Sequence, residues 1–309
     1  MKIKDSLLSR TRLIAERCQE YLISMGLEEP KPRAAHYPFI SGDSFMSLSD
    51  VAVLRSKIKP VIIRPYNMPR IVFVEGELIE ADECLKYALG FKTVIVHNAD
   101  RPISRKVINA CTESGTHLFA TNIRSIEPYI HNIPIGIENL HHRRNGSIHY
   151  YYACNDTMTM GTSEKMLPVL VSFSPNSNRG ERNRVLSICE KKGLKNVMYD
   201  KLNNYRKALR NSMFVISPPG NGIDCHRTWE AIYHKAVPVI ERGNYLYSDN
   251  IELPIHVCES YDDFFSTDIR DLVILYSEIT SRFYPSVYSD WWFELIKKTS
   301  ADLQVVRCK

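Results

Sequence analysis

The sequence predicts an α/β protein made of two halves, each a parallel sheet covered by helices, with a central cleft between them. Short apolar runs alternate along the chain with segments of helical periodicity, and this alternation is typical of βαβ units. It occurs in two series, separated by a polar stretch at residues 141–163. The 309 residues also exceed one ordinary core and suit two domains of about 150 residues. We therefore expect domains at residues 1–155 and 156–309.

The first domain is expected to begin with a helix over residues 4–25, where apolar side chains recur at helical spacing up to Gly26. A proline-rich link follows at residues 28–38. Apolar runs then alternate with helical patterns, and the helices end at Gly90 and Gly115. The predicted order is strands within 51–65 and 69–77, a helix over 78–90, a strand at 91–100, a helix over 104–115 and a strand at 116–122.

The second domain repeats the alternation after the polar stretch, which we interpret as the connection between the domains. Its last segments have helical spacing and include the neighbouring Trp291 and Trp292. The predicted order is a strand at 167–175, a helix over 181–193, a short strand at 196–200, a helix over 202–212, a strand at 213–220, a helix over 224–235, a strand at 236–241, and helical segments at 262–283 and 289–304.

The charge balance restricts the classes of partner. The 40 lysines and arginines outnumber the 35 aspartates and glutamates, which gives a net charge of +5. This mild excess suits an anionic ligand such as a phosphate, but it is too small for a nucleic-acid-binding protein. Solvated surface charges are the alternative explanation.

The cysteines and the apolar runs indicate in which cellular compartment the protein is expected. The eight cysteines include no C-x-x-C pair, a pattern that indicates free thiols in a reducing compartment. The first residues lack the apolar core of a signal peptide, and no apolar run reaches the length of a membrane span. We expect a cytoplasmic protein, and a peripheral contact with the inner face of the membrane stays open.

The most informative stretch, SPPGNGIDCHRTWEAIYHKAVPVI at residues 217–240, joins a strand to a helix through a glycine turn. Gly220 and Gly222, with Asn221 between them, allow a ligand to approach the backbone closely. Asp224 is expected to cap the following helix. The unpaired N–H groups and positive dipole of such a helix end favour an anion. The stretch therefore predicts an anion site.

Three side chains at the start of this helix extend the predicted site. Arg227 stands in the first turn, where a cation is unfavourable for the helix dipole unless a phosphate or carboxylate lies in front of it. His226 could donate to the same anion, and Glu230 could accept hydrogen bonds from sugar hydroxyls. In the alternative interpretation Arg227 only pairs with Glu230, and the glycines only turn the chain.

A second polar strand end, residues 170–186, is expected to contribute to the same site. Ser174 and Asn176 follow an apolar run and offer small donors that leave room for a ligand. Arg179 and Arg182 then begin a helix, where arginines again indicate an anion. If the two strands are parallel neighbours, both groups face one cleft. A solvated basic helix face is the alternative.

The stretch at residues 217–240 resembles the C-terminal nucleotide-sugar motif of exostosin-like glycosyltransferases, glycosyltransferase family 47. That motif has a proline–glycine turn, an arginine followed after two residues by Glu-Ala, and a strand of the type Pro-Val-Ile. Residues 121–139, with the run Pro-Ile-Gly-Ile, resemble the segment near the domain junction of such transferases. The matching residues of the first stretch are Gly220, Arg227, Glu230, Ala231, Pro238, Val239 and Ile240.

The resemblance implies a GT-B fold, in which two Rossmann-like domains face each other across a cleft. The second domain then binds the nucleotide-sugar donor, the first binds the acceptor, and the last helix can pack back on the first domain. Arg227 is expected to contact the donor diphosphate, and Glu230 the ribose or the sugar. Neither a divalent metal nor another cofactor is expected, because basic side chains and a helix end neutralise the leaving diphosphate in many such enzymes.

The expected reaction is hexosyl or pentosyl transfer to an oligosaccharide or glycolipid acceptor in surface polysaccharide biosynthesis. Inverting transfer needs a base that takes the proton of the acceptor hydroxyl. Glu75, Asp100 and His97 are the candidates, because they follow strands of the first domain, whose carboxyl ends face the ligand crevice. We rank Glu75 and Asp100 above His97.

Two other function classes remain open. Residues 220–225 approach the G-x-G-x-x-G pattern of dinucleotide-binding proteins, although Cys225 replaces the third glycine, and Glu241 could bind a ribose. This pattern would suit an NAD(P)-dependent oxidoreductase. A non-catalytic module that binds a sugar phosphate is the second alternative.

Overall fold

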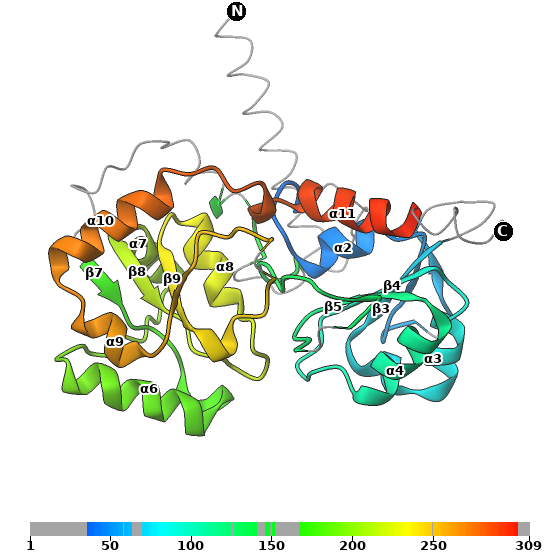
Figure 1. Cartoon of the computed structure of the whole chain (residues 1–309), viewed down its shortest axis with the longest axis horizontal. Helices are drawn as coiled ribbons and strands as arrows, with labels where there is room; N and C mark the ends of the chain where they lie inside the picture. The colour runs from blue at the N-terminus through cyan, green and yellow to red at the C-terminus, as the bar shows by residue number, and fades with distance from the viewer. Residues whose placement is uncertain are drawn as a thin grey trace, which may run out of the picture.

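Two largely parallel sheets lie side by side in the molecule, each with helices on both faces (Figure 1). The predicted α/β class, with two Rossmann-like sheets facing a central cleft, is confirmed. The predicted helix over residues 4–25 and the expected domain division after residue 155 lie outside the described residues. The computed structural model describes residues 36–57, 59–63, 70–124, 127–140, 146–148, 150–151, 167–248 and 250–301.

The first sheet has the order β2-β1-β3-β4-β5-β6. Strand β2 runs antiparallel to β1, and the other neighbours are parallel. The central strands consist mostly of buried β-branched and aromatic residues, as in a sheet that is covered on both faces. Strand β6 falls outside the predicted strands. The strands are β1 (Val51–Val53), β2 (Val61–Ile62), β3 (Ile71–Glu75), β4 (Thr93–His97), β5 (His117–Ala120) and β6 (Ile130–Asn132).

Helix α4 (Arg105–Ser114) begins and ends at recognisable caps. The side chain of Ser104 accepts a hydrogen bond from the backbone N–H of Val107, and Gly115 ends the same helix in the left-handed conformation, as predicted. We call residues 36–151 the first lobe and residues 167–288 the second lobe. The first lobe contains α2 (Gly42–Leu48), the 3₁₀ turn η1 (Gly76–Glu80), α3 (Asp82–Ala88) and α4 (Arg105–Ser114).

The second sheet is parallel throughout, with the order β10-β9-β8-β7. Its helices pack on both faces. The segment predicted as one helical run over residues 262–283 is divided, because Asp268 caps a new helix. The elements are β7 (Leu167–Leu170), η3 (Pro175–Ser177), α6 (Arg179–Lys191), α7 (Leu202–Asn211), β8 (Ser212–Ile216), α8 (His226–Tyr233), β9 (Val237–Glu241), η4 (Arg242–Asn244), β10 (His256–Cys258), α9 (Tyr261–Ser266), α10 (Ile269–Thr280) and η5 (Pro285–Val287).

The predicted short strand at residues 196–200 is wrong. The side-chain amide of Asn196 donates to the carbonyl oxygen of Phe173 and accepts from its N–H, in place of a backbone ladder. Val197 adds a single backbone bond to Val171 before the chain turns outward, and Met198 is exposed. The side chain of Asn196 therefore makes the hydrogen bonds to Phe173 that a neighbouring strand would have made.

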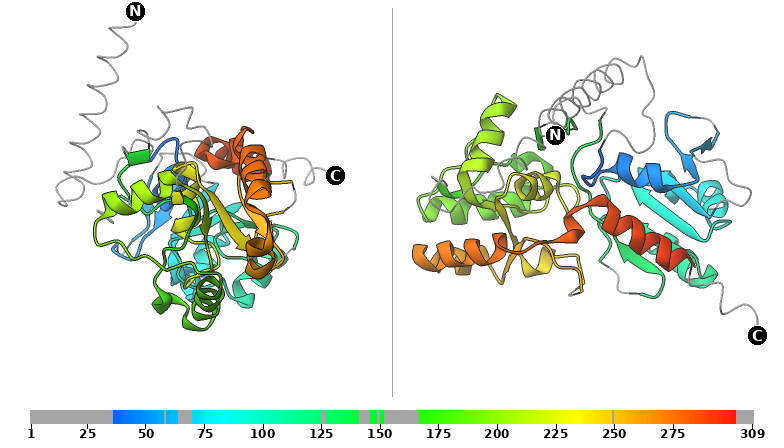
Figure 2. Two further views of the ribbon diagram at one scale, coloured as in Figure 1. Left: turned by 90° about the vertical axis from the view of Figure 1, so that its left-hand side faces the viewer. Right: turned by 90° about the horizontal axis from the view of Figure 1, so that it is seen from above.

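The last helix, α11 (Ser289–Ala301), leaves the second lobe and packs against α2 and β5 of the first (Figures 1 and 2). Trp292 is fully buried, and Ser300 is hydrogen-bonded through its hydroxyl to Thr93. One apolar cluster accordingly includes Phe45 of α2, Trp229 of α8 and Trp292 of α11. No helix of the described part of the chain is long and apolar enough to cross a membrane.

Most of the polar stretch at residues 141–163 lies outside the described residues. Tyr151 within it is nevertheless fully buried, with its ring against those of Phe39 and Tyr233. The end of the first lobe, within the stretch interpreted as the connection, therefore contributes this aromatic side chain to the core.

Candidate active site

A cavity of about 550 Å³ opens between the lobes at the carboxyl ends of both sheets. Its walls come from the loops after β4 and β6, the loops after β7, α6 and β8, and from helices α7 and α8. Ligands of open parallel sheets bind at this edge. The lining residues are Asp100, Ile135 and Glu138 from the first lobe, and Ser172, Ser174, Ser177, Arg182, Met198, Tyr199, Leu202, Tyr205, Gly220, Asn221, Gly222, Asp224, Cys225, His226, Arg227 and Glu230 from the second.

The structure brings most of the predicted donor-binding residues to this cavity. Asn176 and Arg179 are the exceptions, because both side chains are exposed and neither residue lines it. The predicted residues that do line it are Ser174, Arg182, Gly220, Asn221, Gly222, Asp224, His226, Arg227 and Glu230.

Arg182 is buried beneath the turn at residues 218–222. Its Nε donates to the carbonyl oxygen of Pro219 at 2.8 Å, and its Nη1 donates to that of Ser174 at 2.6 Å. Only 4% of the residue is exposed. Burial lowers the pKa of Arg182, and the neighbouring charge of Arg227 lowers it further. The guanidinium thus joins the two strand ends that the sequence indicated as one site.

Arg227 is half-buried beside Arg182. Its Nε donates to the carbonyl oxygen of Ser172 and its Nη1 to that of Pro218, at 3.2 and 3.3 Å. Both guanidinium groups lie within 6 Å of the Phe173 ring centroid, at 5.7 Å for Arg182 and 5.2 Å for Arg227. Within the described residues neither cation forms an ion pair with a carboxylate. Two cations that repel each other line one wall, and a bound anion would relieve that repulsion.

The glycines of the turn permit close contacts. A Cβ atom on Gly220 would lie 2.8 Å from Nη2 of Arg182, and one on Gly222 would lie 2.5 Å from Nδ2 of Asn122. Neither glycine has a positive φ. Their role in this structure is therefore to admit a guanidinium and an amide from other segments against the backbone.

The expectation that Asp224 caps α8 is wrong. The N-cap residue is Cys225, and no side chain caps this helix. Oδ2 of Asp224 instead accepts hydrogen bonds from the N–H of Ile135 at 2.9 Å, Nε1 of Trp229 at 3.0 Å and the hydroxyl of Tyr247 at 2.7 Å. Burial raises the pKa of Asp224, and these hydrogen bonds oppose the rise. The carboxylate therefore joins the lobes.

Two further contacts support this junction between the lobes. Oδ1 of Asn122 accepts from the N–H groups of Ile223 and Asp224, at 2.8 and 2.9 Å. His226 donates from Nδ1 to the carbonyl oxygen of Gly136 at 2.8 Å. Because Asn122 and Gly136 belong to the first lobe, the start of α8 has a defined position relative to both walls of the cavity.

Replacing Asp224 with alanine is expected to reduce the free energy of unfolding by about 3 kcal/mol or more, because three buried donors lose their acceptor. Urea unfolding monitored by circular dichroism measures the change. The exposed Glu113 on α4 offers a matched control, whose alanine variant is expected to stay within about 0.5 kcal/mol of the parent. An Asp224→Ala protein as stable as this control would contradict the role of Asp224 in joining the lobes.

Glu230 lies in the cavity wall with only 5% of its surface exposed. Its Oε2 accepts a hydrogen bond from the hydroxyl of Tyr205 at 3.1 Å. Burial raises the pKa of Glu230, and the charge of Glu138 raises it further, whereas His226 lowers it. The ion pair with Arg227 that the alternative interpretation requires is absent from the described contacts. Glu230 therefore remains available to accept a hydrogen bond from a ligand hydroxyl.

Of the three predicted bases, only Asp100 lines the cavity. Glu75 accepts from the N–H of Arg55 at 2.7 Å and is not a lining residue. His97 is buried, with Nε2 donating to the carbonyl oxygen of Pro134 and Nδ1 accepting from the N–H of Asn98. Burial lowers the pKa of His97 to about 4. Both ring nitrogens are occupied, so His97 is not placed to act on a ligand.

Glu138 and Tyr205 line the cavity and were missed from the sequence. Glu138 follows the run Pro-Ile-Gly-Ile, within the segment that resembles the domain junction of exostosin-like transferases, and this was the available signal. Tyr205 is in a helix that looked ordinary, and only its contact with Glu230 identifies it. Glu138 supplies, with Asp100, a second carboxylate from the first lobe, whereas the arginines belong to the second lobe.

The contacts of Glu241 argue against the alternative of an NAD(P)-dependent oxidoreductase. Its carboxylate forms an ion pair with Arg184 and accepts from the N–H of Tyr261. A ribose would have to displace these partners. Within the described residues, no group of three or more His, Cys, Asp and Glu side chains could hold a metal ion. Independence from metal stays a prediction.

Comparison with known proteins gives one family match. Residues 139–250 match the family model described as the RXYLT1 C-terminal domain. The matched range contains the predicted donor-binding residues from Ser174 to Glu230, and it ends before α9. The match supports a glycosyltransferase. No curated protein matches the chain.

Proposed function

We propose that this protein transfers a sugar from a nucleotide-sugar donor to a glycan hydroxyl, with inversion and without a metal ion. Arg182 and Arg227 carry the proposal: among the described residues neither guanidinium has a carboxylate partner, and both lie beside the start of α8, which no side chain caps. Guanidinium groups and helix N-termini are both suited to phosphate oxygens. We further propose that the protein is an exostosin-like transferase of family 47.

The proposed chemistry depends on stabilising the leaving diphosphate. Negative charge develops on the donor phosphate as the bond to the sugar breaks. Arg227 and the N–H groups at the start of α8 would meet that charge, and Arg182 would support them from beneath the turn. Arg182 is buried and Arg227 is half-buried, so water is partly excluded and each interaction is stronger than in solvent. Glu230, held by Tyr205, would accept hydrogen bonds from donor hydroxyls.

We propose Glu138 as the base that takes the proton of the acceptor hydroxyl. It belongs to the first lobe and lines the same cavity as the donor-binding residues of the second lobe. Burial raises the pKa of Glu230 and the charge of Glu138 raises it further, so the Glu138 carboxylate is within electrostatic range of the donor-binding residues. Asp100 also lines the cavity, but it is exposed, whereas Glu138 is half-buried.

The proposed setting follows from the sequence. The acceptor is an oligosaccharide or a glycolipid in surface polysaccharide biosynthesis, bound on the first-lobe side of the cavity. The reaction takes place in the cytoplasm, at the inner face of the membrane when the acceptor is a glycolipid. The scattered free thiols support a reducing compartment; the described ones are Cys84, Cys111, Cys189, Cys225 and Cys258.

Calorimetric titration with UDP, GDP, ADP, CDP and NAD tests the proposal. At least one nucleoside diphosphate is expected to bind, and its sugar conjugates are expected to be hydrolysed slowly or transferred to an acceptor glycan. Binding of NAD alone would favour the oxidoreductase. Diphosphate binding without turnover of any sugar conjugate would instead favour a non-catalytic sugar-phosphate module.

A further inference from the structure

Two tyrosines of the second lobe line the candidate active site and have no part in the proposed chemistry so far. Tyr199 and Tyr205 are both half-buried, and their ring centroids lie 6.1 Å apart. Leu202, the first residue of α7, and the exposed Met198 line the same cavity. We call these four residues the tyrosine cluster. It adds aromatic and aliphatic surface to a cavity that also holds the two arginines.

Tyr199 reaches the cavity because residues 196–200 do not form the predicted strand. The backbone N–H of Val197 donates to the carbonyl oxygen of Val171 at 3.0 Å, and this is the last backbone bond to the sheet before the chain turns outward. Tyr199 follows two residues later, before α7 begins at Leu202. A side chain outside the sheet is not covered by the helices that pack on the sheet. Its ring is therefore available to a ligand in the cavity.

The tyrosine cluster adjoins the groups that are proposed to hold the donor. The hydroxyl of Tyr205 donates to Oε2 of Glu230 at 3.1 Å. Burial raises the pKa of Tyr205, the charge of Glu230 raises it further, and the charge of Arg227 opposes the rise. The Tyr205 hydroxyl is therefore within electrostatic range of Arg227. Because the ring of Tyr205 also lies beside that of Tyr199, it connects the cation and the carboxylate with the rest of the cluster.

We propose that Tyr199, together with Leu202, binds the base of the nucleotide-sugar donor. A nucleobase is a flat ring that stacks on aromatic side chains, and this contact needs no particular hydrogen-bond partner. A donor with its diphosphate on Arg227 and its ribose on Glu230 would extend its base toward Tyr199. The inference rests on the proposed function, because it places a nucleotide on Arg227. It goes further by naming the residue that holds the base.

Calorimetric titration that compares UDP, GDP, ADP and CDP with inorganic pyrophosphate tests the inference, because pyrophosphate has the two phosphates without a nucleoside. At least one nucleoside diphosphate is expected to bind about tenfold more tightly than pyrophosphate or better. Tyr199→Ala is expected to lower the affinity for that nucleoside diphosphate about tenfold and to leave the affinity for pyrophosphate within about twofold of the parent. Tyr199→Phe keeps the ring and is expected to bind both like the parent.

Saturation-transfer NMR on the unaltered protein gives a second measurement that does not depend on the folding of any variant. The nucleoside diphosphate that binds most tightly is used as the probe. Its base protons are expected to receive more saturation than its ribose protons, because the base would lie against the ring of Tyr199. Base protons that receive the weakest saturation of the ligand would place the base in solvent and overturn the inference.

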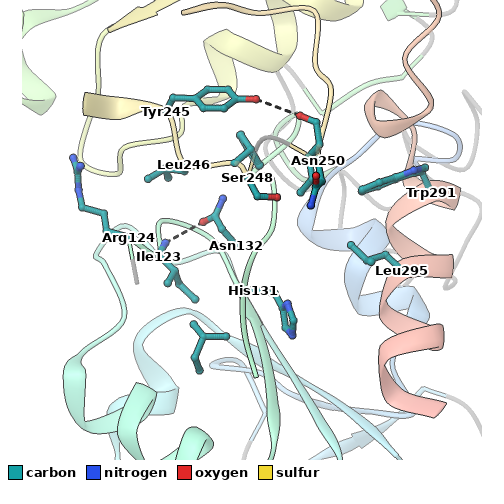
Figure 3. A pocket seen from close by; sticks show the side chains of 13 residues that line it. Ile123, Arg124, His131, Asn132, Tyr245, Leu246, Ser248, Asn250, Trp291 and Leu295 are labelled. Atoms are coloured by element: carbon teal, nitrogen blue, oxygen red, sulfur yellow. Dashed lines mark hydrogen bonds between the residues drawn. The ribbon is translucent and has the colours of Figure 1, made fainter. Parts of the chain in front are cut away.

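A matched control comes from a separate cavity of about 530 Å³ between the lobes (Figure 3). Tyr245 is likewise a half-buried tyrosine of the second lobe, but it lines that cavity and is not a lining residue of the candidate active site. Tyr245→Ala is expected to bind the nucleoside diphosphate and pyrophosphate like the parent. Arg227→Ala, in contrast, is expected to weaken the binding of both.

The outcomes separate this inference from the proposed transfer. If every nucleoside diphosphate binds no more tightly than pyrophosphate, or if Tyr199→Ala weakens both alike, the base site is wrong and the transfer can still stand. Base-dependent binding without turnover of any sugar conjugate would support the base site and contradict the transfer. If neither pyrophosphate nor a nucleoside diphosphate binds, both are wrong. Binding of maltotriose that is lost with Tyr199→Ala, while nucleoside diphosphate binding is kept, would assign Tyr199 to a saccharide instead.

Discussion

Replacing Arg227 with alanine is expected to lower kcat/KM for sugar transfer by about 10³-fold, since the diphosphate loses a preorganised cation as its charge develops. The side chain is half-buried, and carbonyl oxygens of Ser172 and Pro218 hold its Nε and Nη1. It is thus in position before the ligand binds. Affinity for the free nucleoside diphosphate is expected to fall less, by about 10- to 100-fold, as for the loss of a charge-assisted hydrogen bond.

Arg179→Ala is the matched control for this prediction. Arg179 is an arginine of the same helix start as Arg182, but it is exposed and does not line the cavity. Its removal is expected to change kcat/KM less than about threefold, because exposed charges interact weakly through water. Arg227→Lys, which keeps the charge and loses the planar fork, is expected to give an intermediate rate. If Arg227→Ala and Arg179→Ala lower kcat/KM equally, the protein's net charge, and not the position of Arg227, would account for the effect.

Replacing Glu138 with glutamine is expected to lower kcat by about 10² to 10⁴-fold, because the acceptor hydroxyl loses its proton acceptor. The amide has nearly the same shape as the carboxylate, so the wall of the cavity is preserved. Affinity for the nucleoside diphosphate is expected to stay within about twofold of the parent, since the donor contacts lie on the other lobe. Initial rates at saturating donor and calorimetric titration together measure this split.

Asp100→Asn provides the comparison for Glu138→Gln. Asp100 lines the same cavity from the same lobe, but it is exposed. Its removal is expected to change kcat less than about fivefold, because a solvated carboxylate is a weaker general base in this setting. A large loss with Asp100→Asn and a small one with Glu138→Gln would reverse the assignment.

Local patterns predicted most elements of the fold correctly. The apolar run before Glu75 is β3, and the helix ending at Gly115 has its terminus there, because these choices depend on neighbouring residues in the chain. The predicted strand at residues 196–200 failed for a non-local reason. The side-chain amide of Asn196 forms hydrogen bonds with the backbone N–H and carbonyl oxygen of Phe173, 23 residues away. The spacing of apolar residues does not indicate such a contact.

The site was predictable where one short segment supplies several groups. Gly220, Arg227 and Glu230 are close in sequence, and a strand, a glycine turn and a helix start bring them to one wall. The part of the cavity that the first lobe supplies was not predictable in this way. Asp100 and Glu138 come from different loops of the first lobe, and their placement depends on how the lobes pack.

The sequence by itself determined the alternating elements, the parallel sheets and the turn that places Arg227 at the start of α8. These features follow from the spacing of apolar residues and from glycine, which act over a few residues. Only the tertiary structure decided the role of Asp224, whose carboxylate accepts from Ile135, 89 residues earlier, and from Tyr247, 23 residues later. A buried carboxylate takes its role from the donors around it, and those donors assemble only when the two lobes meet.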